Sequence, residues 1–243
     1  MARSAANSDL NRRDFLRLSS LAAGAIVPPL AAASPLATAP VPPAPATEAP
    51  AAYLSLGPDE AALVERLVDV MCPADELSPA GTELGLAQFI DRQLAGAFGQ
   101  GQGLYLRGPF RPGIPEDGYQ RPLTPLDFFR HGLHGLDQAC RRRRGGGFAD
   151  LDAGAADAVL TEVAAGGWDA EQTGLSEWFN DLLYPLFVQA CFADPVYGGN
   201  RGKAFWRLVG YPGLPAVYSR DMITYRGRPH PAAKDPKSIE DFS

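Results

Sequence analysis

The sequence predicts an all-α fold: a single irregular bundle of about five to six helices with long loops rich in glycine and proline. Two observations lead to this prediction. Apolar residues recur at three- and four-residue steps through most of the chain after residue 52. No run combines strict apolar–polar alternation with the β-branched residues that are typical of strands. The length of 243 residues is enough for one domain with a sizeable core.

Capping residues predict four helices in the body of the chain, because proline or an acidic residue opens each one and glycine or proline follows its end. We expect them from Gly57-Pro58 to Pro73, from Thr82-Glu83 to the run 99–103, from Thr124-Pro125 to Arg144, and from Asp152 to Gly166. The four arginines 141–144 are interpreted as cations that complement the dipole of a helix C-terminus, rather than as an anion site.

The most hydrophobic helix is expected over 175–191, and we place it at the centre of the bundle. Pro185 lies inside it, so a backbone hydrogen bond near Asp181 is lost and a kink is expected. A short helix is expected over 202–209. The run 100–122 is too rich in glycine and proline for a helix, and its aromatic residues are expected to pack on this domain or on a partner: Tyr105, Phe110 and Tyr119.

The N-terminal stretch has the features of an export address. Arg12-Arg13, followed by Phe15-Leu16 and a short apolar run, is similar to a twin-arginine signal. We therefore expect a signal peptide over 1–33, cleaved after Ala33 or Ala46, and a proline- and alanine-rich disordered linker over 34–52. The folded domain is expected over 53–217, followed by an extended tail over 218–243. The net charge of −6 disfavours nucleic acid as a partner.

One stretch, 194–213, combines more glycines, prolines and large aromatic side chains than any other part of the chain. Such residues hold special backbone conformations and supply the apolar area that partners use, so two interpretations stand. Either the stretch closes over its own core, or it binds a partner. The candidate interface residues are Asp194, Pro195, Tyr197, Gly198, Gly199, Asn200, Arg201, Trp206, Tyr211 and Pro212.

The pattern Asp194-Pro-x-Tyr-Gly-Gly-Asn-Arg, followed by an aromatic pair and by 210–213 (Gly-Tyr-Pro-Gly), resembles the signature of the gluconate 2-dehydrogenase subunit 3 family. The resemblance extends over about 56–215. It implies a small subunit that accompanies a GMC-type, FAD-dependent flavoprotein dehydrogenase and a multihaem cytochrome c subunit that holds haem c. It further implies a non-catalytic role: stabilising the flavoprotein and carrying it through the twin-arginine translocase. The chain would then be periplasmic and would associate peripherally with the inner membrane through the complex.

The rest of the sequence is consistent with a chain that holds no catalytic residue, metal or cofactor of its own. It has no dinucleotide-binding or phosphate-binding glycine motif and no haem-attachment motif. His131 and His134 have a spacing that could clamp a metal, but no third ligand accompanies them. Cys72, Cys140 and Cys191 are either buried small hydrophobes, or one of them, Cys191, forms a disulfide with a partner subunit.

Two alternatives remain at this stage. The chain could be a free-standing periplasmic protein that binds a small ligand between the Tyr-Gly-Gly-Asn turn and the 100–122 loop. It could also be a small enzyme that uses the same turn.

Overall fold

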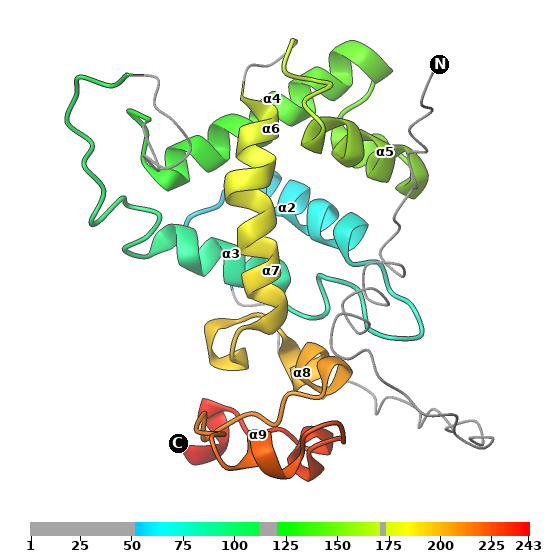
Figure 1. Cartoon of the computed structure of the whole chain (residues 1–243). Coiled ribbons are helices and arrows are strands. Elements are labelled where there is room, and N and C mark those ends of the chain that lie inside the picture. The colour runs from blue at the N-terminus through cyan, green and yellow to red at the C-terminus, as the bar shows by residue number, and fades with distance from the viewer. Residues whose placement is uncertain (1–51, 112–120, 171–173) are drawn as a thin grey trace, which may run out of the picture. The chain divides into compact units, whose positions relative to one another are not determined.

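The computed structural model describes residues 52–111, 121–170 and 174–243. Within these ranges the chain is helical and contains no β-strand, which confirms the all-α prediction (Figure 1). The twin-arginine motif, both cleavage sites, Tyr119 and most of the proline-rich linker lie outside the described residues. No helix of the described part is long and apolar enough to cross a membrane.

Three helices begin and end close to the predicted positions. They are α2 (Pro58–Met71), α4 (Pro125–Arg144) and α5 (Ala153–Ala164). Thr124 caps α4 by accepting a hydrogen bond from the Asp127 N–H, and Asp152 does the same for α5 through the Ala155 N–H. Gly145 ends α4 with φ of 80°, the left-handed conformation that glycine adopts without strain. Local capping chemistry was therefore sufficient to place these helices.

Helix α3 (Leu86–Ala95) begins later than the predicted Thr82-Glu83 start. The Thr82 N–H and hydroxyl both donate to Asp69 of α2, at 2.8 and 2.9 Å, so Thr82 binds the neighbouring helix instead of capping its own. Gly81 makes this approach feasible, since a Cβ there would lie 2.5 Å from the Val68 carbonyl oxygen. A contact between helices has overridden a local start pattern.

The predicted hydrophobic helix forms a long rod made of α6 (Leu175–Trp178), a π-helical segment (Phe179–Leu183) and α7 (Tyr184–Phe192). In Figure 1 it is the yellow helix; α6 packs on α4 and α5, and α7 packs on α3. The irregularity expected from Pro185 takes the form of the π segment just before it, which adjusts the hydrogen-bond ladder where proline supplies no N–H. Trp178 packs fully buried against Gly132 of α4, where a Cβ would lie 2.1 Å from its ring.

The three cysteines lie in the core. Cys72, Cys140 and Cys191 are all buried, and no disulfide joins them within the described part of the chain. Burial, followed by the nearby Asp137 carboxylate, raises the pKa of the Cys140 thiol to about 11. Cys191 is only 4 % exposed, and its disulfide to a partner subunit stays a prediction. The alternative, a small buried hydrophobe, describes it better.

The predicted extended tail differs from the structure. Residues 218–243 form α9 (Asp221–Thr224) and two 3₁₀ turns, Pro231–Lys234 and Ile239–Phe242. Aromatic rings hold this segment together: Tyr218 contacts both Tyr211 and His230 edge-on, and His230 contacts Tyr225 with ring centres 4.5 Å apart. The folded domain therefore continues to residue 243 rather than ending at 217. Sequence periodicity could not show this, because no element in the segment is longer than one turn.

The run after α3 also departs from expectation. Tyr105 is 79 % exposed and does not pack on the domain, whereas Phe110 is half-buried. The part of this run beyond residue 111 lies outside the described residues until 121.

Candidate functional site

The signature loop, residues 194–213, contains two 3₁₀ turns (Pro195–Tyr197 and Arg201–Lys203) and helix α8 (Ala204–Val209). Its high density of glycine has a steric cause in this structure. A Cβ on Gly199 would lie 2.5 Å from the Ala190 carbonyl oxygen of α7. The Gly198 carbonyl oxygen in turn leaves no room for a Cβ on Gly85, at the start of α3. The loop is thus packed backbone against backbone on α3 and α7.

Asn200 holds the centre of the loop. Its side chain is fully buried and its backbone has φ of 48°, in the left-handed region that asparagine tolerates better than most residues. The Asn200 Nδ2 group donates to the Ala193 carbonyl oxygen at 3.1 Å, and its Oδ1 accepts from the Phe205 N–H at 3.0 Å. One amide therefore satisfies the last turn of α7 and the start of α8 together.

Trp206 lies inside the domain and not on its surface. Its side chain is 5 % exposed, its indole N–H donates to the Phe192 carbonyl oxygen at 2.8 Å, and its ring meets that of Tyr211 edge-on at 5.0 Å. Of the two interpretations of the stretch, this placement of Trp206 favours closure over the domain's own core. The large aromatic residue fills the junction between α7, α8 and the C-terminal segment, residues 214–243.

Asp194 joins the loop to that C-terminal segment. Its carboxylate accepts from the Val196 N–H at 3.1 Å and from the Ile239 N–H at 2.9 Å. Lys203 forms an ion pair with Asp241, and Gly213 pairs with Lys237 through an isolated backbone bridge. Of the ten predicted interface residues, Gly198, Gly199, Asn200 and Trp206 are buried, and the rest are half-buried apart from Tyr197, which is 51 % exposed.

Most of the exposed apolar surface in this region lies on the outer face of α7, and the interface prediction included only its last member, Tyr197. Tyr184, Val188 and Phe192 follow each other at four-residue steps and are 44, 37 and 45 % exposed. The 3₁₀ turn that follows, which opens the signature loop, adds two more exposed apolar residues, Val196 and Tyr197. We call these five residues the apolar stripe. The sequence of this helix is hydrophobic on all sides. A helix of this kind is normally buried on all sides, so the pattern indicates that a further surface covers the outer face of α7.

The two aromatic rings of the stripe on α7, Tyr184 and Phe192, pack against other aromatic rings of the domain. Tyr184 stacks between Phe179 and Phe187, with ring centres 6.0 and 6.2 Å away. Phe192 meets the buried Phe205 of α8 edge-on at 5.7 Å. The stripe is therefore preorganised, which lowers the entropy lost when a partner covers it.

These features agree with a comparison to known protein families. The sequence model described as Gluconate 2-dehydrogenase subunit 3 matches residues 58–213, well over half of the chain. The chain belongs to the gluconate 2-dehydrogenase subunit 3 family. It has no significant match among curated proteins or among solved structures. The matched range runs from the first residue of α2 to the last residue of the signature loop.

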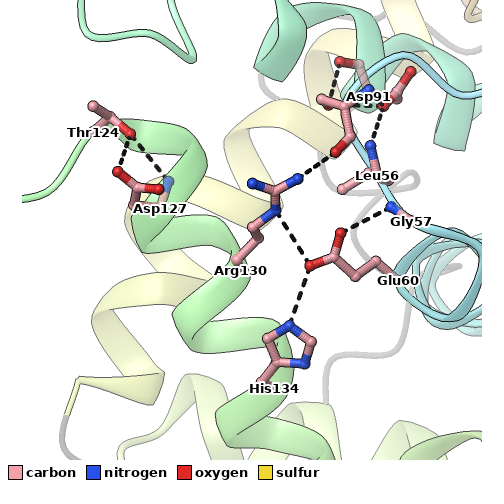
Figure 2. Close-up of polar contacts among 9 residues, drawn as sticks. Leu56, Gly57, Glu60, Asp91, Thr124, Asp127, Arg130 and His134 are labelled. Atoms are coloured by element: carbon pink, nitrogen blue, oxygen red, sulfur yellow. Dashed lines mark hydrogen bonds and ion pairs between the residues drawn. The ribbon is translucent and has the colours of Figure 1, made fainter.

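The N-terminal edge of the subunit 3 domain is fixed by a polar network, shown in Figure 2. Asp91 of α3 is 2 % exposed and accepts hydrogen bonds from the N–H groups of Leu54, Ser55 and Leu56, of which Figure 2 labels Leu56. Three successive donors on one carboxylate compensate for the burial of its charge. The segment that leads into α2 is thereby attached to α3.

Glu60 of α2 extends this network to α4 (Figure 2). Its carboxylate accepts from the Gly57 N–H at 3.0 Å and lies 3.2 Å from Arg130 Nε and 3.1 Å from His134 Nε2. His134 is therefore engaged with an acidic side chain across a helix interface. No group of three or more metal-ligating side chains lies together in the described ranges.

An apolar cleft of about 590 Å³ lies in the C-terminal segment. Its lining consists of Leu214, Pro215, Ala216, Ile239, Phe242 and Ser243. The Tyr-Gly-Gly-Asn turn does not line it, because that turn is filled by its own contacts with α3 and α7. The cleft thus offers no support for a ligand held between this turn and the 100–122 loop.

Proposed function

We propose that this chain is a non-catalytic small subunit of a GMC-type, FAD-dependent dehydrogenase complex of the gluconate 2-dehydrogenase kind. The observation that carries the proposal is the family match over 58–213, since the name of the family is that of one subunit of a multi-subunit enzyme. In this proposal FAD is held by the flavoprotein subunit and haem c by an associated multihaem cytochrome c subunit. The flavin oxidises a C–OH group, and the electrons pass to the cytochrome.

The apolar stripe is the surface that we assign to the flavoprotein. Its five members are exposed apolar residues that extend from α7 into the first turn of the signature loop, and aromatic residues of this kind dominate protein interfaces. The signature loop supports the stripe from behind, because Asn200 and Trp206 both bond to the last turn of α7. Covering the stripe would stabilise both subunits by removing apolar surface from water.

We further propose that the chain carries the flavoprotein through the twin-arginine translocase to the periplasm. Arg12, Arg13, Phe15 and Leu16 form the export motif on which this part of the proposal rests. That pathway transports folded proteins, so a flavoprotein without a signal of its own could cross with this subunit. The complex would then associate peripherally with the inner membrane.

Co-expression with the flavoprotein tests the proposal. A tag on this chain should retrieve a stoichiometric yellow partner, while the isolated chain should be colourless and should reduce no dye with a sugar acid. Changing Arg12 and Arg13 to Lys should leave both proteins in the cytoplasm, whereas the complex should still form there. A lone colourless monomer would contradict the subunit role and favour a free-standing binding protein. Normal export of the flavoprotein with the Lys variant would contradict the carrier role alone.

A further inference from the structure

Helix α9 presents two large apolar side chains almost entirely to water. Met222 is 69 % exposed and Ile223 is 81 % exposed, although both sit in the folded C-terminal segment. Their neighbour Tyr225 is turned inward to the ring of His230. Met222 and Ile223 are therefore exposed on a folded helix and not on an extended tail.

The same segment has a charge opposite to that of the whole chain. Residues 218–230 hold Arg220, Arg226 and Arg228 against Asp221, so their net charge is 3 − 1 = +2, whereas the whole chain has −6. The Asp221 carboxylate lies 3.4 Å from His230, inside the segment. Arg228 donates to the Thr224 carbonyl oxygen and stacks on Tyr225.

Arg220 and Arg226 are exposed and differ from Arg228 in their contacts. Within the described part of the chain, neither guanidinium has an ion pair or a hydrogen bond. They lie on either side of the Met222–Ile223 pair, two and three residues away in the sequence. We call these four residues the α9 tip.

We infer that the α9 tip binds the surface of an anionic membrane. Apolar side chains that enter the acyl boundary, flanked by arginines at the level of the phosphates, are the arrangement by which short segments bind lipid interfaces. Charge complementarity favours this occupant: the tip is cationic on an acidic protein, so an acidic lipid surface attracts it while repelling the rest of the chain. Two protruding side chains also suit a soft surface better than a flat protein interface, which needs a packed apolar centre.

This inference goes beyond the proposed complex and does not depend on it, because lipid binding can be measured with this chain alone. The full chain is mixed with vesicles of phosphatidylcholine, with and without phosphatidylglycerol, and sedimented with them. It should bind the anionic vesicles more strongly, and added salt should weaken that binding. Arg220→Gln with Arg226→Gln should lower the partition coefficient by about tenfold or more. Met222→Ser with Ile223→Ser should lower it by a similar factor.

Arg107→Gln with Arg111→Gln is the matched control, because it removes the same charge from two other exposed arginines. It should leave vesicle binding unchanged. The N-terminal stretch is the same in every variant, so its own affinity for lipid does not affect the comparison, and thermal melting verifies that each variant is folded. Equal loss in the control would overturn the inference, as would equal binding to neutral and anionic vesicles. Loss of the flavoprotein by the tip variants, with lipid binding intact, would instead make the tip a protein interface.

Discussion

The buried centre of the signature loop, around Asn200 and Trp206, and the apolar stripe lie close together in the chain, but the first is shielded from water and the second is exposed to it. In the loop, the amide of Asn200 and the indole of Trp206 are buried and bonded to backbone carbonyls. On the stripe, Tyr184 and Val188 have no backbone peculiarity, yet they leave large apolar surfaces exposed. The comparison teaches that dense glycine and aromatic residues mark where a chain is constrained, whereas the surface offered to a partner can lie on an ordinary helix.

Replacing Trp206 by Ala is the strongest way to break this comparison. A buried indole lost from a packed junction should lower the free energy of unfolding by about 3–5 kcal/mol. Denaturant unfolding of the isolated chain measures this loss. Trp206→Phe, which keeps most of the apolar volume but not the N–H donor, should cost clearly less. If the Trp206→Ala chain keeps the original free energy of unfolding but fails to bind the flavoprotein, Trp206 belongs to the interface after all.

Asn200 offers a finer test of the same buried loop. Asn200→Ala removes both hydrogen bonds and puts alanine, which tolerates a positive φ less well than asparagine, at this position. It should cost about 2–4 kcal/mol of unfolding free energy. Asn200→Gly loses the same two bonds but relieves the backbone, and should cost roughly 1 kcal/mol less. The difference between the two variants isolates the conformational part. Equal losses would mean that the left-handed backbone contributes nothing.

A smaller, pH-dependent effect is expected where the C-terminal segment is attached. The ion pair with Lys203, together with hydrogen bonds from Ser238, holds the pKa of Asp241 well below its usual range. A carboxylate with a depressed folded-state pKa stabilises the fold above its unfolded value of about 3.9, and this contribution is lost as the pH falls below that value. Acidification from pH 5 towards pH 3 should therefore lower the protection factors of the 237–242 amides, that is, raise their exchange rates relative to an unstructured peptide at the same pH.

Asp241→Asn is the control for that experiment, because asparagine cannot form the ion pair at any pH. At pH 5 the 237–242 amides of the variant should have lower protection factors than those of the original chain. On acidification these protection factors should change less in the variant. A variant with the same pH response as the original chain would show that another group attaches the segment.

Part of this structure could be predicted from the sequence, and the limits have physical causes. Thr124, Asp152 and Gly145 act through bonds within their own turns, so local patterns located α4 and α5. Thr82 binds Asp69 of another helix, and the tail is held by contacts such as Tyr211 with Tyr218, so both depended on tertiary structure that no local pattern contains. The family could be inferred from the signature, in which Gly199 and Gly213 have no room for a Cβ.

The candidate interface was harder to predict for a related reason. The signature loop drew attention through residue types, but residue type does not tell whether a side chain points inward, as Trp206 does, or outward, as Tyr197 does. The hydrophobic helix before it was expected to be central, and this expectation concealed its exposed face. Only the tertiary packing, with α3 and α8 against α7, shows which residues of this helix remain exposed.

The central claim, that the stripe and not the buried part of the signature loop binds the flavoprotein, is tested most directly at Val188. Val188→Glu places a charge in the middle of the stripe, and Gln189→Glu places the same charge on the next exposed residue of α7. We expect Val188→Glu to weaken the complex by about 2 kcal/mol or more. Gln189→Glu should change the binding free energy much less, and both isolated variants should keep nearly the original melting temperature. Full affinity of the Val188→Glu chain for the flavoprotein would contradict the claim.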